Sequence, residues 1–202
     1  MAKNLSSGAK TGLIVGGILL LVALWFVSNY NKLVREEEKT TQAWAQVENA
    51  YQRRADLIPN LVKTVKGAAD FEKGTLESVI QARAEATSVK VDPTELNEES
   101  IAAFEKAQNG LSASLGRLMM VVERYPELKA TENFKELQAQ LEGTENRISV
   151  ERKKFNECVQ AYNVKVRRFP TNIVAGIFGF GKKAYFKATE GAEKAPEVDF
   201  EF

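Results

Sequence analysis

The sequence predicts an all-α protein in which a single N-terminal transmembrane helix is followed by an antiparallel up-and-down four-helix bundle. Three observations lead to this fold class. Residues 12–28 contain no charged side chain. Beyond Tyr30, large apolar residues recur at seven-residue spacing, which is typical of helices that pack on one another as in coiled coils. No stretch alternates apolar and polar residues over a length that would form a strand.

The apolar stretch over residues 12–30 is interpreted as an uncleaved membrane anchor behind a short tail, residues 1–11. It has about the minimum length of a helix that spans a bilayer. Trp25 and Tyr30 lie near one end, where aromatic side chains favour the headgroup level. The alternatives are a cleaved signal peptide and a buried core helix. No small-residue cleavage motif precedes Tyr30, and the apolar core is long for a signal peptide.

The charges that flank the anchor give a near tie for its orientation. Lys3 and Lys10 precede it, and Lys32, Arg35 and Lys39 follow it. Basic residues favour the cytoplasmic side, whereas acidic residues contribute little. The short cationic tail favours a tail inside the cell and a bundle on the extracytoplasmic side.

Glycines in the anchor predict a face for self-association. Gly8, Gly12 and Gly16 recur at every fourth residue, a spacing that lets two helices approach closely in lipid. Gly8 is expected outside the hydrocarbon, so Gly12 and Gly16 are the candidate residues. The alternative is that glycine is simply common in membrane helices.

The bundle is predicted over residues 31–170. Its first helix carries an apolar stripe of Trp44, Val47, Tyr51, Ile58, Leu61, Val65 and Ala68. Pro59 removes one backbone hydrogen bond and predicts a bend near Asp56. Two glycines and a weaker stripe over residues 67–74 favour a break, after which a second helix continues to about Val89. A helix without this break would leave three helices and end the chain far from the membrane.

Cap residues and prolines delimit the other two helices. Asp92 and Pro93 are typical of a helix start. Tyr125 and Pro126 are expected to end that helix, and Thr131 to cap the last one. The last helix has the most regular spacing, with Phe134, Leu141, Ile148, Phe155, Tyr162 and Phe169 each seven apart, and Pro170 ends it.

The chain after Pro170, residues 171–202, is predicted to be an apolar segment followed by an extended tail. Large apolar side chains beside Lys182 and Lys183 suit a membrane interface or a partner groove. The residues expected to contact lipid or a partner are Ile173, Val174, Ile177, Phe178, Phe180 and Phe186. The alternative is that the segment folds back and caps its own bundle.

The composition argues against several function classes. Basic and acidic residues nearly balance, 28 to 27, which argues against a nucleic-acid partner. The chain has no histidine, the commonest general base and transition-metal ligand. Cys158, the single cysteine, lies on the apolar stripe and is expected to pack in the core. We therefore expect no catalytic activity, no cofactor and no metal site.

Polar residues on the first and last helices are interpreted as hydrogen-bonding groups that fix the helices relative to one another. These residues are Arg53, Arg54, Asp56, Gln138, Glu142, Glu145, Asn146 and Arg152.

Several segments resemble the LemA family. They include Tyr30-Asn31-Lys32-Leu33-Val34, Ala43-Trp44-Ala45-Gln46-Val47-Glu48, Arg53-Arg54-Ala55-Asp56-Leu57-Ile58-Pro59-Asn60-Leu61-Val62, Val79-Ile80-Gln81-Ala82-Arg83-Ala84, Leu137-Gln138-Ala139-Gln140-Leu141-Glu142-Gly143-Thr144-Glu145-Asn146 and Phe169-Pro170-Thr171-Asn172. The resemblance covers nearly the whole chain in order. It implies a bacterial single-pass membrane protein with a helical bundle, and it implies no reaction.

The function expected from the sequence is a non-enzymatic, self-assembling scaffold at the bacterial inner membrane. Membrane lipid, further copies of the chain and other membrane proteins are the expected partners. The alternative is a lipid-contacting, membrane-remodelling protein that acts through its apolar C-terminal segment.

Overall fold

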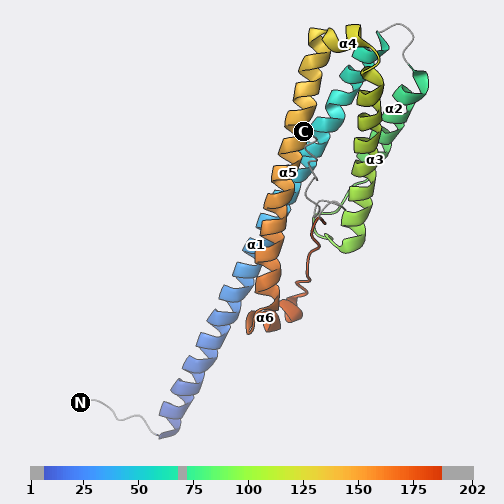
Figure 1. The fold of residues 1–202 in the computed structure, drawn as a ribbon. Helices are drawn as coiled ribbons and strands as arrows, with labels where there is room; N and C mark the ends of the chain where they lie inside the picture. The colour runs from blue at the N-terminus through green and yellow to red at the C-terminus, as the bar shows by residue number, and fades with distance from the viewer. Residues whose placement is uncertain (1–6, 68–71, 188–202) are drawn as a thin grey trace, which may run out of the picture.

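The structure, a computed structural model, describes residues 7–67 and 72–187, and the regular structure of these residues is entirely α-helical, as predicted. Six helices follow one another along the chain (Figure 1): α1 (Ser7–Lys66), α2 (Lys73–Ser88), α3 (Glu98–Val122), α4 (Pro126–Ala130), α5 (Glu132–Arg167) and α6 (Thr171–Phe178). The start of the predicted N-terminal tail, the stripe residue Ala68 and the predicted tail beyond residue 187 lie outside the described residues.

The helices form two antiparallel pairs of unequal length. The C-terminal half of α1 packs along α5, and α2 and α3 form a shorter pair beside them, while the N-terminal half of α1 extends away alone (Figure 1). The lengths differ from those of a regular four-helix bundle, because α2 has 16 residues and α5 has 36. The short helices α4 and α6 also add to the four that were predicted.

The predicted break after the first helix is confirmed, because α1 ends at Lys66 and α2 begins at Lys73. No break separates the anchor from the bundle, since α1 runs without interruption from Ser7 past residue 30. At about 1.5 Å per residue, its 60 residues extend about 90 Å. The helix also continues through Pro59.

The predicted start of the third helix was wrong by several residues. The carboxylate of Asp92 accepts hydrogen bonds from the backbone N–H and the hydroxyl of Thr94, at 2.8 and 2.7 Å, and so stabilises a turn. The cap of α3 is Asn97 instead, whose side-chain oxygen accepts from the backbone N–H of Ser100 at 2.9 Å. The Ser100 hydroxyl accepts in return from the backbone N–H of Asn97, which completes a capping box.

The predictions for the last helix hold at most positions. Thr131 precedes α5 as predicted, but its hydroxyl donates to the backbone oxygen of Leu128 and does not cap the helix. Pro126 begins the short α4. Phe169 is 76% exposed, so the last member of the seven-residue series was wrong. Because α5 already ends at Arg167, Phe169 no longer follows its helical face.

The core consists of three clusters along the molecule. The cluster farthest from the free end of α1 is aliphatic apart from Phe134 and includes Ile58, Leu61, Val65, Leu111 and Leu118. The central cluster is rich in aromatic side chains: Trp44, Tyr51, Phe104, Phe155 and Phe186. The third cluster lies nearest the free half of α1 and contains Leu33, Tyr162, Val166, Val174 and Ala175.

Candidate contact site beside the apolar half of α1

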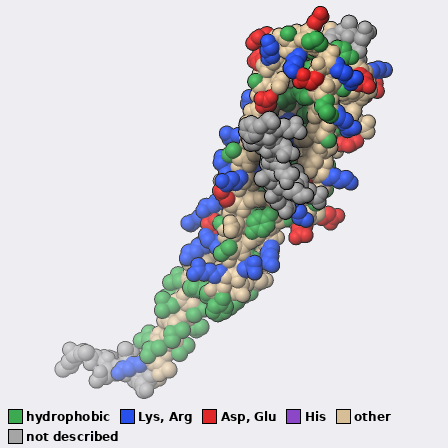
Figure 2. Space-filling view, in the orientation of Figure 1, with side chains coloured by type: hydrophobic (Ala, Val, Ile, Leu, Met, Phe, Trp, Pro, Cys, Tyr) green, Lys and Arg blue, Asp and Glu red, His purple; other side chains and the backbone are tan. Residues whose placement is uncertain are grey.

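The N-terminal half of α1 is long and apolar enough to cross a membrane, and its most apolar window has no residue buried by the rest of the protein. Figure 2 shows this half as a projecting rod covered by hydrophobic side chains. The charged residues that delimit it, Lys10 and Lys32, lie about 33 Å apart on a helix that rises about 1.5 Å per residue. This length matches a bilayer hydrocarbon core of about 30 Å.

The two predicted self-association glycines lie on this exposed half. A Cβ atom added at Gly12 or Gly16 would meet no atom within 4 Å. The face that they mark is therefore open to a second helix.

Helix α5 brings the chain back to the end of the apolar half. The hydroxyl of Thr171, the first residue of α6, donates to the side-chain oxygen of Asn29 at 3.2 Å. The ring of Phe178 lies 4.8 Å from the ring of Tyr30, and that of Phe180 lies 5.7 Å away. The C-terminal apolar segment thus returns to the point where α1 enters the bundle, as the antiparallel arrangement predicted.

The six residues predicted to contact lipid or a partner divide into two groups. Ile173, Ile177 and Phe178 are exposed on α6, and Phe180 is half-buried against the third cluster. Val174 and Phe186 are buried, at 0% and 4% exposure, so the prediction that they form a contact surface was wrong.

Val174 and Phe186 are buried for different reasons. Helix α6 carries large apolar residues on its exposed face as well as its buried one, and Val174 lies on the face that packs in the third cluster with Leu33 and Tyr162. Phe186 follows a reversal of the chain: after Gly181, residues 182–187 run back along the bundle (Figure 1). We call residues 182–187 the C-terminal strap. The alternative prediction, a segment that folds back on its own bundle, is thus correct for the strap.

Two asparagines of α5 bind the backbone of the strap. The side chain of Asn163 donates to the backbone oxygen of Lys183 at 2.8 Å and accepts from its N–H at 2.9 Å. Asn156 makes the same pair of bonds with Phe186, at 3.0 and 2.9 Å. Asn156 and Asn163 are seven residues apart on a helix, and Lys183 and Phe186 are three residues apart on an extended segment. Both separations are about 10 Å, so each asparagine lies opposite its partner. Sequence reasoning missed both asparagines, although asparagine inside a helix is unfavourable and was a usable signal.

Aromatic and cationic groups enclose Phe186. Its ring stacks on Trp44 at 5.7 Å and meets the edge of Phe155 at 5.4 Å. The guanidinium of Arg152 lies 4.5 Å from the ring centre, a cation–π contact. These contacts explain why this phenylalanine joins the core and does not face solvent.

Acidic residues just beyond the apolar half of α1 pair with lysines of the bundle. Glu36 binds Lys165 of α5 at 2.6 Å and Lys39 at 3.0 Å. The hydrogen bond from Lys165 is the main reason that the pKa of Glu36 lies below its ordinary value of 4.5, and partial burial opposes this shift. Glu37 binds the buried Lys183 of the strap at 3.1 Å.

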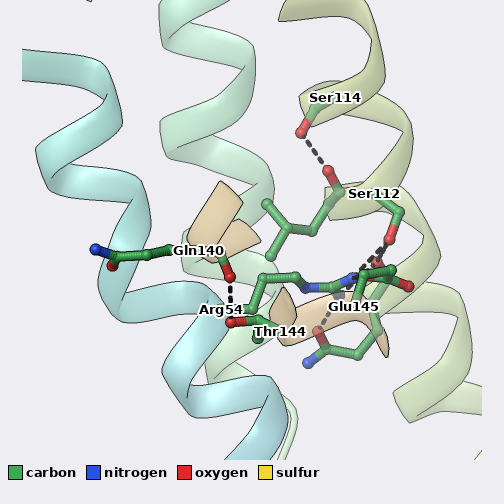
Figure 3. Close-up of polar contacts among 8 residues, drawn as sticks. Arg54, Ser112, Ser114, Gln140, Thr144 and Glu145 are labelled. Atoms are coloured by element: carbon green, nitrogen blue, oxygen red, sulfur yellow. Dashed lines mark hydrogen bonds and ion pairs between the residues drawn. The ribbon is translucent and has the colours of Figure 1, made fainter. Parts of the chain in front are cut away.

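A buried arginine joins the helices in the middle of the bundle (Figure 3). Arg54 of α1, which is 2% exposed, donates to Ser112 and Gln108 of α3 at 2.8 Å each and to Glu145 of α5 at 2.9 Å. Gln108 in turn donates to the backbone oxygen of Ala86 in α2 at 3.1 Å. The predicted role in fixing the helices is therefore confirmed for Arg54 and Glu145.

The other polar residues of that set differ in whether they join two helices. Arg152 of α5 binds Glu105 of α3 at 2.5 Å and so also joins two helices. Gln138 and Glu142 bind each other along one helix at 3.0 Å, and Asp56 accepts from Gln52 at 2.8 Å. These two contacts join no helices, and Arg53 and Asn146 are exposed.

A model of the LemA family matches residues 43–200. The chain belongs to the LemA family. Its relatives include the magnetosome protein MamQ 2 of Paramagnetospirillum magneticum, which is 28% identical over 204 residues, 92% of this chain and 75% of the relative. The magnetosome protein MamQ of Magnetospirillum gryphiswaldense is 27% identical over 91% of this chain and 75% of its own. Protein LemA of Metamycoplasma hominis is 23% identical over 93% of this chain and 84% of its own.

Two groups in this LemA-family chain bear on metal binding and nucleophilic chemistry, namely the acidic side chains and the single cysteine. Among the described residues, no group of three or more histidine, cysteine, aspartate or glutamate side chains is placed to hold a metal ion. Burial raises the pKa of the half-buried Cys158 thiol, with Glu157 adding to the shift, so the thiol is not activated as a nucleophile. The family, the all-helical fold and the apolar helix fit a membrane-associated helical protein.

Proposed function

We propose that the chain is a single-pass protein of the bacterial inner membrane that holds its helical bundle beside the bilayer as a non-enzymatic scaffold. One observation carries the proposal: the apolar half of α1 and the bundle half of α1 are one uninterrupted helix. A flexible linker would let a soluble domain move freely over the membrane surface. A continuous helix fixes the position of the bundle relative to the bilayer, which is what a scaffold requires.

Assembly of several copies is part of the proposal. Gly12 and Gly16 leave an open face on the apolar half, and small residues at this spacing allow close approach of helices in lipid. Because the bundles are fixed to their anchors, two anchors in contact would set two bundles side by side. Other membrane proteins could dock on the same array.

We propose further that the short tail lies inside the cell and the bundle on the extracytoplasmic side. The support is the short cationic tail ahead of the apolar stretch. Protease added to intact spheroplasts should then digest the exposed bundle. A bundle that stays protected until the membrane is lysed would contradict this orientation.

The scaffold proposal is tested on the full-length protein in lipid bilayers. We expect wild-type protein to cross-link into oligomers and Gly12→Ile together with Gly16→Ile to remain mostly monomeric, since two large side chains would hold the helices apart. Gly17→Ile is the matched control: Gly17 is equally open but lies about 100° around the helix from Gly16. A wild-type protein that is monomeric, or oligomers that persist in the double variant, would overturn assembly through this face.

A second candidate function is membrane remodelling. The exposed apolar residues Ile173, Ile177 and Phe178 of α6, at the level where α1 leaves its apolar half, favour it. Half-buried Phe180 adjoins them. Electron microscopy of the same bilayer vesicles distinguishes the two functions, because a scaffold leaves the vesicles spherical and a remodelling protein deforms them.

A further inference from the structure

Five exposed basic residues surround the end of the apolar half of α1: Lys32, Arg35, Arg167, Arg168 and Lys182. We call them the basic collar. They come from three segments, namely α1, the C-terminal end of α5 and the start of the strap. Figure 2 shows basic side chains gathered where the apolar rod joins the bundle.

Contacts between the segments bring the collar together. Lys165 binds Glu36 and Thr171 binds Asn29, so Arg167 and Arg168 lie between these two levels of α1. The bonds between Asn163 and Lys183 place Lys182 beside the same end of α5. Because residues far apart in the sequence meet here, the flanking charges of the anchor alone do not reveal the collar.

The collar residues have no acidic partners of their own. None of the five forms an ion pair within the part of the chain that the structure describes. The nearest acids on α1 are used elsewhere: Glu36 binds Lys39 and Lys165, and Glu37 binds Lys183. Glu38 and Glu98 are exposed nearby, but these two carboxylates offset only part of the charge of the five basic residues. The collar therefore has an excess of positive charge.

The height of the collar matches the headgroup layer. Lys32 and Arg35 lie about 3 and 8 Å beyond Tyr30 along the helix axis. A headgroup layer is about 5–8 Å thick on each side of the hydrocarbon. Ile177 and Phe178 are exposed at the same end, and apolar side chains beside basic ones are typical of a surface that lies in the membrane interface.

On these grounds we propose that the basic collar binds the headgroups of anionic phospholipids and so selects them as neighbours of the anchor. This inference rests on the membrane anchorage in the proposed function. Each lysine or arginine near a membrane surface contributes about 1 kcal/mol of attraction to anionic lipid. The collar thereby sets both the depth of the bundle and the composition of the lipid around it.

The test uses full-length protein reconstituted in phosphatidylcholine bilayers with trace spin-labelled phosphatidylglycerol or spin-labelled phosphatidylcholine. Electron paramagnetic resonance measures the fraction of each label whose motion the protein restricts. We expect phosphatidylglycerol to be preferred by about threefold or more at low salt, with the preference falling as salt screens the charges.

Two charge variants show which basic residues cause the preference for phosphatidylglycerol. K32Q/R35Q/R167Q/R168Q/K182Q removes the collar and should bring the ratio of restricted phosphatidylglycerol to restricted phosphatidylcholine close to one. K63Q/K66Q/K106Q/R117Q/K135Q removes the same charge from exposed positions farther along the bundle and should leave the preference unchanged. Equal losses in both variants would mean that net charge, and not the collar, attracts the lipid, and would overturn the proposal.

The remaining outcomes distinguish a failure of the collar proposal from a failure of the membrane anchorage. If neither label is restricted, the protein is not inserted, and both the anchorage and the collar proposal fail. If both labels are restricted equally in wild-type protein, the anchorage stands and the collar proposal fails, which would favour an acidic protein surface as the partner of these residues. If the collar variant misfolds by circular dichroism, the salt dependence of the wild-type preference decides, and a preference unchanged by salt would overturn the proposal.

Discussion

The two halves of α1 belong to one continuous helix, but the N-terminal half is exposed and the C-terminal half packs on other helices. In the N-terminal half, large apolar side chains point in all directions and are exposed, as in Leu13 at 65%, Leu20 at 61% and Val27 at 58%. In the C-terminal half, apolar residues form a single stripe, and Trp44 and Leu61 on it are 0% exposed. A helix that is apolar on all sides suits a lipid environment, whereas a helix with one apolar stripe suits packing on other helices.

This difference means that the two halves should respond to different substitutions. The C-terminal half gains its stability from protein contacts, so it should depend on packing volume. In the N-terminal half, no residue of the most apolar window is buried by the rest of the described protein, so this half should depend on the apolar character of each residue and not on its shape.

The largest expected effect is on packing. Phe155→Ala should lower the free energy of unfolding of the bundle by about 3–5 kcal/mol, because it leaves a cavity at a position that is 0% exposed and in contact with Trp44 and Phe186. Denaturant unfolding of the full-length protein in detergent measures the loss, and Phe178→Ala, at an exposed site, is the control. A loss well under 1 kcal/mol would mean that the central cluster does not hold α1 against α5.

A somewhat smaller effect is expected in the apolar half. Leu20→Arg should disfavour membrane insertion by about 3 kcal/mol, the cost of an arginine near the centre of a spanning helix. The fraction of protein that resists alkaline extraction from membranes should fall, while the unfolding of the bundle should not change. Leu20→Ile is the control. Lost bundle stability in the arginine variant would show that the two halves are not independent.

The smallest expected effect lies at the boundary between the halves. Glu36→Gln should reduce stability by at most about 1 kcal/mol at neutral pH, because the glutamate is paired with two half-exposed lysines. The pKa of Glu36 is lowered in the folded state, so its contribution is present above the ordinary value of 4.5 and is lost as the pH falls below it.

Unfolding of wild-type and Glu36→Gln protein between pH 7 and pH 3 measures this contribution. The difference between the two proteins should shrink toward zero in acid. Glu38→Gln, an exposed neighbour on the same helix, should behave as wild type throughout. A difference that grows in acid would contradict the assigned direction of the pKa shift.

Sequence periodicity identified the main buried residues of helices that pack along one face. Trp44, Ile58, Phe134 and Tyr162 are all buried as predicted, because a helix must turn its apolar stripe toward a partner. The break after Lys66 was also predicted, since glycines and a weakened stripe mark it. Phe169 was misassigned because a seven-residue spacing has no meaning beyond the end of a helix.

The candidate site was predictable only in part. The apolar composition of residues 171–180 placed exposed Ile177 and Phe178 in a contact segment, and the return of α5 placed that segment beside the anchor. The burial of Phe186 depends on Asn156, thirty residues away, and on a ring of aromatic side chains from three helices. No local pattern around Phe186 carries that information.

The sequence by itself determined the helical content, the apolar half of α1, the main core stripe and the family, because each is written in neighbouring residues or in the period of one helix. Only the tertiary structure decided that α1 continues from the apolar half into the bundle and that the strap is bound by Asn156 and Asn163. It also decided that basic residues of three segments lie around the end of the apolar half. The physical reason is that hydrogen bonds, ring contacts and charge clusters act over a few ångströms in space. Residues far apart along the chain come within that range only when α5 folds back against α1.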